Sequence, residues 1–255
     1  ESTKPVRVMQ VIARMNVGGP AVLVADLMRS LDSQRFSSVL ATGYCDENES
    51  DYLDEVAQDV DVIRIPGLGR SVSPIKDLSA FFLLVKEIRR FKPDVIHTHT
   101  AKAGVLGRLA GLIARPQAKR IHTFHGHLLN GYFGSVKRRL VITAEQVLAV
   151  FTHQLLAVGN KVRQDLLHEG IGKISKFGLM PPGLDIGQLP NRAAAKKFYG
   201  LSPISLQCAF IGRVTQIKRP DRFLDVVSEL KKRGVKIDFF IAGDGELLEA
   251  CRERI

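Results

Sequence analysis

The stretch DVIHTHTAKAGVLGRLAGLIARPQAKRIHTF, residues 94–124, decides the fold class of this chain. It begins with a short β-branched run at 94–99, continues with a helix-like pattern at 102–114 and ends with a second β-branched run at 119–124. A strand, a helix and a strand in this order form the crossover that joins parallel neighbours in a sheet. The stretch therefore predicts a β-α-β unit.

The same alternation extends from this unit in both directions. Further strands are predicted at 6–13, 36–43, 60–65 and 153–158, and further helices at 20–31, near 50–58, at 74–91 and at 135–151. Strands that are apolar throughout, rather than alternating, are typical of a sheet buried on both faces. The predicted fold class is α/β, with a doubly wound parallel sheet.

Residues 178–190, GLMPPGLDIGQLP, interrupt this pattern with glycine and proline, which are typical of a linker. We expect an N-terminal domain over 1–180, an interdomain linker over 181–204 and the start of a second domain over 205–255. The second part repeats the alternation, with strands at 205–212 and 236–243 and helices near 219–233 and from 245. Two strands and two helices cannot cover both faces of a parallel sheet, so the second domain is expected to be truncated in this chain.

Composition is that of a soluble globular protein, with 45% hydrophobic residues and no stretch that approaches the roughly 18 apolar residues of a spanning helix. The first residues lack the architecture of a signal peptide, so a cytoplasmic location is expected. The three cysteines lie far apart and have no CxxC spacing. This spacing argues against both a disulfide framework and a thiolate zinc site.

The net charge of +11 is unevenly distributed, since residues 64–120 hold twelve Lys or Arg and only three acids. Such a surplus favours anionic partners: sugar nucleotides, phospholipid headgroups or nucleic acid. Nucleic acid is not expected, because no RRM, helix-turn-helix or finger signature accompanies the charge. The alternative is a solvated basic surface on an ordinary enzyme.

Ligands in open α/β sheets bind beyond the carboxyl ends of strands, so the loops after strands are the candidate sites. The first such loop, RMNVGGPA at 14–21, places Gly18 and Gly19 before Pro20, at a helix N-terminus that can bind an anion. It has neither the GxGxxG of a dinucleotide site nor the GK[ST] of a P-loop. A tight turn is the alternative explanation of the glycine pair.

The second candidate loop is FIGRVTQIKRP, residues 210–220, which also follows a predicted strand. Arg213 and Lys218 could converge on a diphosphate, the arginine through its fork and the lysine as a point charge. Fixed cations of this kind can neutralise a departing diphosphate without a metal. The alternative is a basic helix start on a solvated surface.

The third candidate is HTFHGH, residues 122–127, with a neighbouring HTHTAKAG at 97–104. His122 lies inside the strand and is expected in the core, whereas His125 is placed to contact a sugar or an incoming hydroxyl. His99 and Lys102 fall at the end of the adjacent strand, so they should lie near His125, with the lysine able to bind an anionic acceptor. A zinc site is not expected, because Gly126 interrupts the histidines and no HExxH motif or cysteine cluster is present.

The order of these motifs resembles a known family. The segments are VIARMNVGGPAVLVADLMRSLD, DVIHTHTAKAGVLGRLAG, HTFHGHLLNGYF, PPGLD, FIGRVTQIKRPDRFLDVV and FFIAGDGELLEA, and together they span nearly all of the chain. They resemble the retaining, nucleotide-sugar-dependent glycosyltransferases of GT-B fold, glycosyltransferase family 4, in their bacterial polysaccharide branch. The chain departs from that pattern at Pro182, where many relatives have Asn, and the Glu-x7-Glu motif of the family is expected beyond residue 255.

The resemblance implies two Rossmann-like domains that face each other across a cleft, with the donor held mainly by the second. Gly18 and Gly19 match the loop that approaches the donor phosphates, Arg213 and Lys218 match the basic pair at the diphosphate, and His125 matches the histidine near the reacting sugar. Gly243, Asp244 and Gly245 match a loop close to the nucleobase. The resemblance implies no cofactor and no divalent metal, and it gives the basic surplus a use in docking on an anionic membrane.

The function expected from this resemblance is transfer of a sugar, with retention, from a UDP-sugar to a sugar or lipid-linked acceptor in polysaccharide biosynthesis. His125, Lys102 and His99 would act on the sugar and acceptor side. Two alternatives stay open: a UDP-sugar epimerase on the same scaffold, and a non-catalytic truncated binding module. The chain taken alone is expected to turn over poorly.

Overall fold

The structure is a computed structural model that describes residues 4–47, 49–126, 135–183 and 187–254. Its contacts divide the chain into two compact units, Glu1–Asp185 and Ile186–Ile255. No helix within the described ranges is long and apolar enough to cross a membrane.

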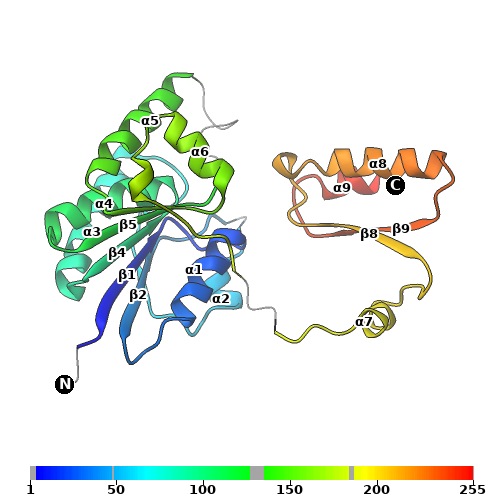
Figure 1. Cartoon of the computed structure of the whole chain (residues 1–255), viewed down its shortest axis with the longest axis horizontal. Helices are drawn as coiled ribbons and strands as arrows, with labels where there is room; N and C mark the ends of the chain where they lie inside the picture. The colour runs from blue at the N-terminus through cyan, green and yellow to red at the C-terminus, as the bar shows by residue number, and fades with distance from the viewer. Residues whose placement is uncertain (1–3, 48, 127–134, 184–186, 255) are drawn as a thin grey trace. The chain divides into compact units, whose positions relative to one another are not determined.

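The first unit is built on a parallel sheet with the strand order β3-β2-β1-β4-β5-β6-β7 (Figure 1). The strands are β1 (Val6–Ile12), β2 (Phe36–Thr42), β3 (Val62–Arg64), β4 (Val95–His99), β5 (Lys119–Phe124), β6 (Gln154–Ala157) and β7 (Phe177–Leu179). The direction in which strands are added reverses between β1 and β4, as it does in doubly wound folds. This switch point is where ligands bind in such sheets.

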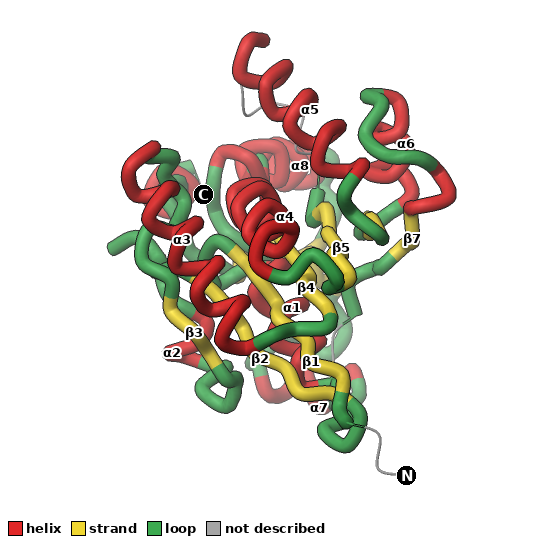
Figure 2. The backbone as a smooth tube through the Cα atoms, turned by 90° about the vertical axis from the view of Figure 1, so that its left-hand side faces the viewer, coloured by secondary structure: helices red, strands yellow, loops and turns green. Residues whose placement is uncertain are grey.

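Helices cover both faces of the sheet. They are α1 (Gly19–Arg29), α2 (Tyr52–Glu55), α3 (Pro74–Phe91), α4 (Ala101–Ala114), α5 (Ser135–Val150) and α6 (Asn160–His168). In β1, Met9 and Val11 belong to the core cluster that includes α3 and α4, whereas Ile12 packs with α1 and α2. Figure 2 shows α3 and α4 on one side of the strands and α1 behind them. A third cluster joins β5, β6 and β7 to α5 and α6.

The strands and helices predicted in the first unit are all present, and α3 has the predicted bounds. Two elements were not predicted, α6 and β7. Helix α6 is mostly polar, NKVRQDLLH, with Val162 and Leu166 as its buried residues. Strand β7 has three residues, Phe177–Leu179, one of which is Gly178. A three-residue strand at the start of a glycine- and proline-rich stretch carries almost no periodic signal.

Helix α4 packs unusually close to the sheet because it presents glycines to the strands. A Cβ on Gly107 would lie 2.8 Å from Cγ2 of Thr98, and a Cβ on Gly104 would lie 2.5 Å from Cε1 of His122. The same helix carries Arg108, which is 2% exposed and donates from Nη2 to both carboxylate oxygens of Glu145 on α5, at 2.8 and 2.7 Å. This buried ion pair joins α4 to α5.

In the described residues of the second unit, β8 (Leu206–Ile211) pairs in parallel with β9 (Ile237–Ala242). Its helices are α7 (Arg192–Phe198), α8 (Pro220–Lys232) and α9 (Leu248–Arg252). Strands and helices alternate as predicted. Helix α7, however, lies within the predicted linker 181–204, where Asn191 caps it by accepting a hydrogen bond from the Ala194 amide at 2.9 Å.

Candidate functional site

The candidate site of the first unit lies at the carboxyl ends of β1, β4 and β5, which are neighbours in the sheet. Thr100 follows β4 and has a φ of 64°, a left-handed conformation that is uncommon for a residue other than glycine. Its Oγ1 accepts a hydrogen bond from the amide of Ala13, which follows β1. Backbone strain of this kind tends to occur at functional sites.

A chain of hydrogen bonds connects the three strands at this edge. Nε2 of His99 lies 2.8 Å from Oε1 of Gln10, and Nδ1 of His99 lies 2.9 Å from Nε2 of His125. An amide oxygen can only accept, so the proton of His99 is on Nε2 and its Nδ1 accepts from His125. His125 therefore carries its proton on Nε2 and keeps an unprotonated Nδ1.

His99 has no exposed surface. It was predicted to act directly on the sugar or acceptor, but its two ring nitrogens are both engaged within the protein. Its place is behind His125, where it fixes the orientation of that ring. Gln10 was not predicted at all, although a polar residue inside the strand VRVMQVI was a signal that could have identified it.

Burial keeps the histidines of β4 and β5 neutral. It lowers the pKa of His125 to about 4. Burial, together with the charge of His125, lowers the pKa of His97 to about 3. Burial and nearby charges hold the pKa values of His99 and His122 well below the ordinary value. At neutral pH, His125 can therefore accept a proton or a hydrogen bond and does not act as a cation.

These shifts predict a loss of stability in mild acid. The unfolded chain binds protons below about pH 6.5, whereas the folded chain does so only near the lowered pKa values, so stability is complete above pH 6.5 and falls as the pH drops toward 4. Each histidine adds a slope of up to about 1.4 kcal/mol per pH unit. Melting temperatures measured from pH 8 to 4.5 should show this fall, and a smaller one in His97→Gln. A melting temperature constant down to pH 5 would contradict the prediction.

Lys102 does not have the free charge that its predicted role requires. Its Nζ donates to the carbonyl oxygens of Gly67 and Ser71 at 2.8 and 2.6 Å and lies 2.5 Å from Oδ1 of Asp77. An ammonium group has three N–H donors, so these contacts occupy all of them. In this structure Lys102 holds the β3–α3 loop against α4.

Gly18 and Gly19 lie at the start of α1, as predicted, but the chain geometry does not require glycine there. Gly18 has an extended conformation with φ 164° and ψ 171°. A Cβ on Gly18 would approach one atom, the Asn16 carbonyl oxygen at 3.7 Å, and a Cβ on Gly19 would meet nothing within 4 Å. The tight-turn explanation is therefore wrong, and the missing side chains leave the helix N-terminus open.

The double substitution Gly18→Ala, Gly19→Ala tests this difference. We expect the melting temperature to stay the same or rise slightly, since each alanine restricts the unfolded chain without strain in the folded one. We expect the affinity for a nucleoside diphosphate to fall roughly tenfold, because the methyl groups occupy space at the anion site. Gly43→Ala is the control, and we expect it to destabilise the fold, because a Cβ there would lie 1.5 Å from the Leu68 carbonyl oxygen. A folding defect in the double variant would restore the turn explanation.

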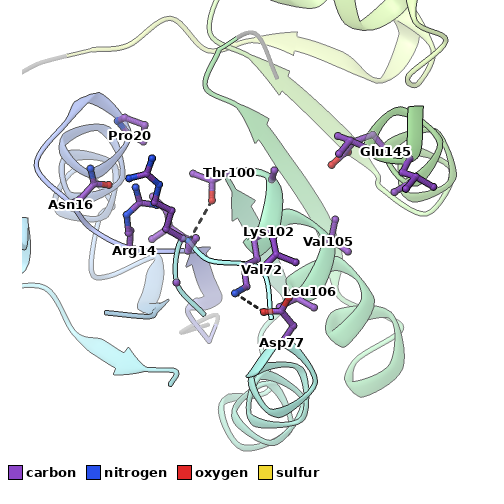
Figure 3. A pocket seen from close by; sticks show the side chains of 18 residues that line it. Arg14, Asn16, Pro20, Val72, Asp77, Thr100, Lys102, Val105, Leu106 and Glu145 are labelled. Atoms are coloured by element: carbon purple, nitrogen blue, oxygen red, sulfur yellow. Dashed lines mark hydrogen bonds and ion pairs between the residues drawn. The ribbon is translucent and has the colours of Figure 1, made fainter. Parts of the chain in front are cut away.

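A pocket of about 560 Å³ opens beside these loops (Figure 3). Arg14, Asn16 and Pro20 lie on one side of it, and Thr100, Lys102, Val105 and Leu106 of the α4 region on another. Helix α5 contributes Leu140, Val141, Ala144 and Glu145. The volume falls within the range of roughly 300–1,000 Å³ typical of small-molecule sites.

In the second unit, the loops after β8 and β9 are joined by hydrogen bonds. The amide of Val214 donates to the carbonyl of Asp244 at 2.8 Å, and the amide of Leu247 donates to the carbonyl of Val214 at 3.0 Å. The glycines permit this approach: a Cβ on Gly243 would lie 1.9 Å from the Gly212 carbonyl oxygen, and a Cβ on Gly245 would lie 2.5 Å from that of Val214. Both have a φ of 151°. Close packing of the loops therefore accounts for these two glycines.

Arg213 and Lys218 lie on the loop that this packing fixes, and both are exposed. Neither side chain has a hydrogen bond or ion pair with any residue in the described part of the chain. The next residue, Arg219, differs, because its guanidinium pairs with Asp221 at 2.6 Å. Both predicted cations are thus available to an external anion.

The described residues contain no group of three or more His, Cys, Asp or Glu side chains arranged to hold a metal. Of the three histidines in HTFHGH, His122 bonds through Nδ1 to Oγ1 of Thr98 at 2.8 Å, and His125 bonds to His99. The third, His127, lies outside the described residues.

The sequence is similar to known transferases. The sequence model described as Glycosyltransferase Family 4 matches residues 17–188. UDP-Gal:alpha-D-GlcNAc-diphosphoundecaprenol alpha-1,3-galactosyltransferase of Escherichia coli is 31% identical over 209 residues, which are 78% of this chain and 52% of that protein. EpsF of Bacillus subtilis (strain 168) is 25% identical over 253 residues, 97% of this chain and 64% of its own length. The chain thus spans between half and two thirds of the length of these relatives.

Solved structures share the fold. Anabaena Alr3699/HepE, in complex with UDP and glucose, matches with a TM-score of 0.74 and 14% identity over 98% of this chain and 66% of that chain. UDP-GlcNAc 2-epimerase from Methanocaldococcus jannaschii matches with a TM-score of 0.58 and 12% identity over 97% of this chain and 67% of that chain. These likenesses confirm the predicted α/β class and GT-B fold. A fold that an epimerase also has does not by itself select the reaction.

Proposed function

The chain belongs to glycosyltransferase family 4, and from this membership we propose that it transfers a sugar, with retention, from a UDP-sugar to a sugar or lipid-linked acceptor. The reaction creates negative charge on the departing nucleoside diphosphate. An enzyme accelerates the reaction if it stabilises that charge more strongly in the transition state than in the ground state.

The observation that carries the proposal is the pair of free cations, Arg213 and Lys218. Both are exposed and have no side-chain partner among the described residues. Their loop is fixed by hydrogen bonds to the loop after β9. Because the loop backbone is held in place, both side chains start from fixed positions, and two cations there can take the place of a divalent ion at a diphosphate. We therefore assign them to the leaving group and expect no metal or cofactor.

Other residues take the remaining roles in this proposal. Gly18 and Gly19 leave the N-terminus of α1 open to a phosphate. The loop that contains Asp244 would lie near the nucleobase. His125, neutral at pH 7 and held by His99, would accept a hydrogen bond from a sugar or acceptor hydroxyl. The name of the Escherichia coli relative supports a UDP-sugar donor and a diphosphate-linked acceptor.

A transfer assay tests the proposed function. Incubation of the chain with individual UDP-sugars and a diphosphate-linked sugar acceptor should release UDP and give a longer glycan with one of the donors. The anomeric configuration of the new bond, read by NMR, should be that of the donor. An isomerised nucleotide sugar formed without acceptor would indicate epimerisation instead. If neither sugar transfer nor isomerisation occurs with any donor, a non-catalytic binding module is favoured.

We also propose that the first unit docks at the cytoplasmic face of an anionic membrane. On α3, the apolar side chains Ile75, Leu78 and Phe82 are 84%, 58% and 60% exposed, and Lys86 and Arg89 continue the same stripe. Basic residues beside exposed apolar ones favour an anionic lipid surface.

This docking predicts cosedimentation with vesicles that contain phosphatidylglycerol, and less with vesicles of phosphatidylcholine alone. Phe82→Glu should weaken cosedimentation, because it places a negative charge at the lipid surface. Val226→Glu on α8, where the wild-type side chain is 50% exposed, is the matched control and should bind as the wild type does. Equal binding to both kinds of vesicle would overturn the proposal.

A further inference from the structure

The pocket in the first unit has apolar walls that come from three separate parts of the chain. They include Val72 from the loop before α3 and Val105 and Leu106 from α4 (Figure 3). Helix α5 adds Leu140, Val141 and Ala144. Sugars need hydrogen-bond partners around most of their surface, and these walls offer none. The pocket therefore suits a hydrocarbon better than a sugar ring.

The apolar surface continues outward from the pocket. Leu140 is 67% exposed and Val72 is 83% exposed, although both line the cavity. Ile75, three residues after Val72, is 84% exposed and begins the apolar stripe of α3. Contiguous exposed apolar surface marks a place where a ligand or partner is covered from water. A chain longer than the pocket could continue along this surface.

Two arginines also line the pocket. Arg14 donates from Nε and Nη2 to Glu49 at 2.6 and 2.8 Å, which orients the guanidinium and leaves its Nη1 without a partner among the described residues. Arg70 is exposed, and its Nη1 lies 3.9 Å from Glu49. The two arginines and one glutamate leave one net positive charge. Guanidinium groups bind phosphate oxygens through forked hydrogen bonds.

The other charged residues of the pocket are already paired. Lys102 is held by Asp77 and two carbonyl groups, and Glu145 is held by Arg108. Apart from the uncharged polar residues Asn16 and Thr100, the groups left to a ligand are thus a hydrocarbon surface and a cationic side. A ligand with an apolar chain attached to a diphosphate matches both.

We propose that this pocket holds the first isoprene units of a polyprenyl-diphosphate-linked acceptor, with the diphosphate at Arg14 and Arg70. The inference rests on the proposed function and narrows its acceptor from a sugar or lipid-linked class to a lipid-linked one. The Escherichia coli relative, named for a diphosphoundecaprenol substrate, is consistent with this chemistry.

Binding of farnesyl diphosphate to the full chain, measured by isothermal titration without any nucleotide sugar, tests the site directly. Farnesyl diphosphate should bind at least about tenfold more tightly than inorganic pyrophosphate or farnesol, because it alone uses both parts of the pocket. If farnesyl diphosphate binds no more tightly than pyrophosphate, the proposal is overturned.

Two substitutions locate the site. Leu140→Glu should weaken binding of farnesyl diphosphate about tenfold or more, since it places a charge against the hydrocarbon chain. Val147→Glu is the matched control on the same helix, because Val147 is 54% exposed and does not line the pocket. Arg70→Gln should weaken binding of farnesyl diphosphate and leave that of farnesol unchanged. If Leu140→Glu and Val147→Glu lose equal affinity for farnesyl diphosphate, the proposed location of the site is contradicted.

The outcome separates this inference from the proposed function. Transfer to a lipid-free sugar acceptor, with a rate unaffected by Leu140→Glu, would overturn the pocket assignment and leave the glycosyltransferase proposal intact. Selective binding of farnesyl diphosphate that is lost in Leu140→Glu, with no sugar transfer to any acceptor, would support the pocket and overturn the proposed reaction.

Discussion

Replacement of both Arg213 and Lys218 by alanine is expected to lower the rate of sugar transfer at least about a thousandfold. Removal of a single group that stabilises a developing charge typically lowers kcat by a factor of about 10²–10³. The reason is the charge that appears on the nucleoside diphosphate as the glycosidic bond breaks. Both side chains are exposed, so their removal leaves the fold intact. Steady-state assays of released UDP at saturating acceptor measure the effect.

Lys231→Ala with Lys232→Ala is the matched control for this experiment. These lysines lie in the last turn of α8, are exposed, and carry the same total charge as Arg213 and Lys218. If general electrostatic attraction were responsible, both double variants would lose activity to the same extent. Near wild-type transfer by the Arg213 and Lys218 variant would contradict their role at the leaving group.

The second large effect concerns stability. Glu145→Ala is expected to lower the free energy of unfolding by about 3–5 kcal/mol, because it leaves the guanidinium of Arg108 buried without its counter-charge. In a domain of this size the melting temperature should fall by roughly 10 °C. Calorimetry or thermal unfolding followed by circular dichroism measures the change.

The double variant Arg108→Met, Glu145→Leu is the control, because it removes both charges and keeps apolar volume. Replacement of a buried ion pair by hydrophobic residues is often neutral or stabilising, so this variant should be more stable than Glu145→Ala. If Glu145→Ala unfolds at the wild-type temperature, the ion pair contributes nothing to the packing of α4 against α5.

Hydrophobic patterning predicted most of the fold, because short runs rich in β-branched residues, such as that of β4, alternate with amphipathic helices such as α3. It failed for β7, whose three residues are too few to show a period, and for α7, whose short sequence RAAAKKF lies in a proline-rich region. In both cases tertiary contacts and a capping side chain determine the structure, and a pattern along the sequence does not contain that information.

The candidate site could be predicted where the geometry of the sheet alone determines which residues lie close together. His99 ends β4 and His125 follows β5, the adjacent parallel strand, so it could be inferred from the sequence that the two residues are neighbours. The partners of Lys102 could not be predicted, because Gly67 and Ser71 of the β3–α3 loop and Asp77 of α3 lie more than 20 residues away in the sequence. The role of Gln10 could not be predicted either, since it depends on the orientation of the His99 ring on another strand.

Gly18 and Gly19 illustrate a further limit. Sequence reasoning offered a tight turn or a ligand as the cause of the pair, and no pattern in the sequence separates them. The extended backbone of Gly18 and the empty space at both Cβ positions remove the first explanation. For Gly243 the opposite holds, because the neighbouring backbone itself excludes a side chain.

The most direct test of the central claim compares the affinities of UDP and uridine for the chain by isothermal titration. If Arg213 and Lys218 bind the diphosphate, UDP should bind the wild-type chain at least about a hundredfold more tightly than uridine, and most of this difference should vanish in the double alanine variant. A difference between UDP and uridine that is as large in the variant as in the wild type would contradict the account.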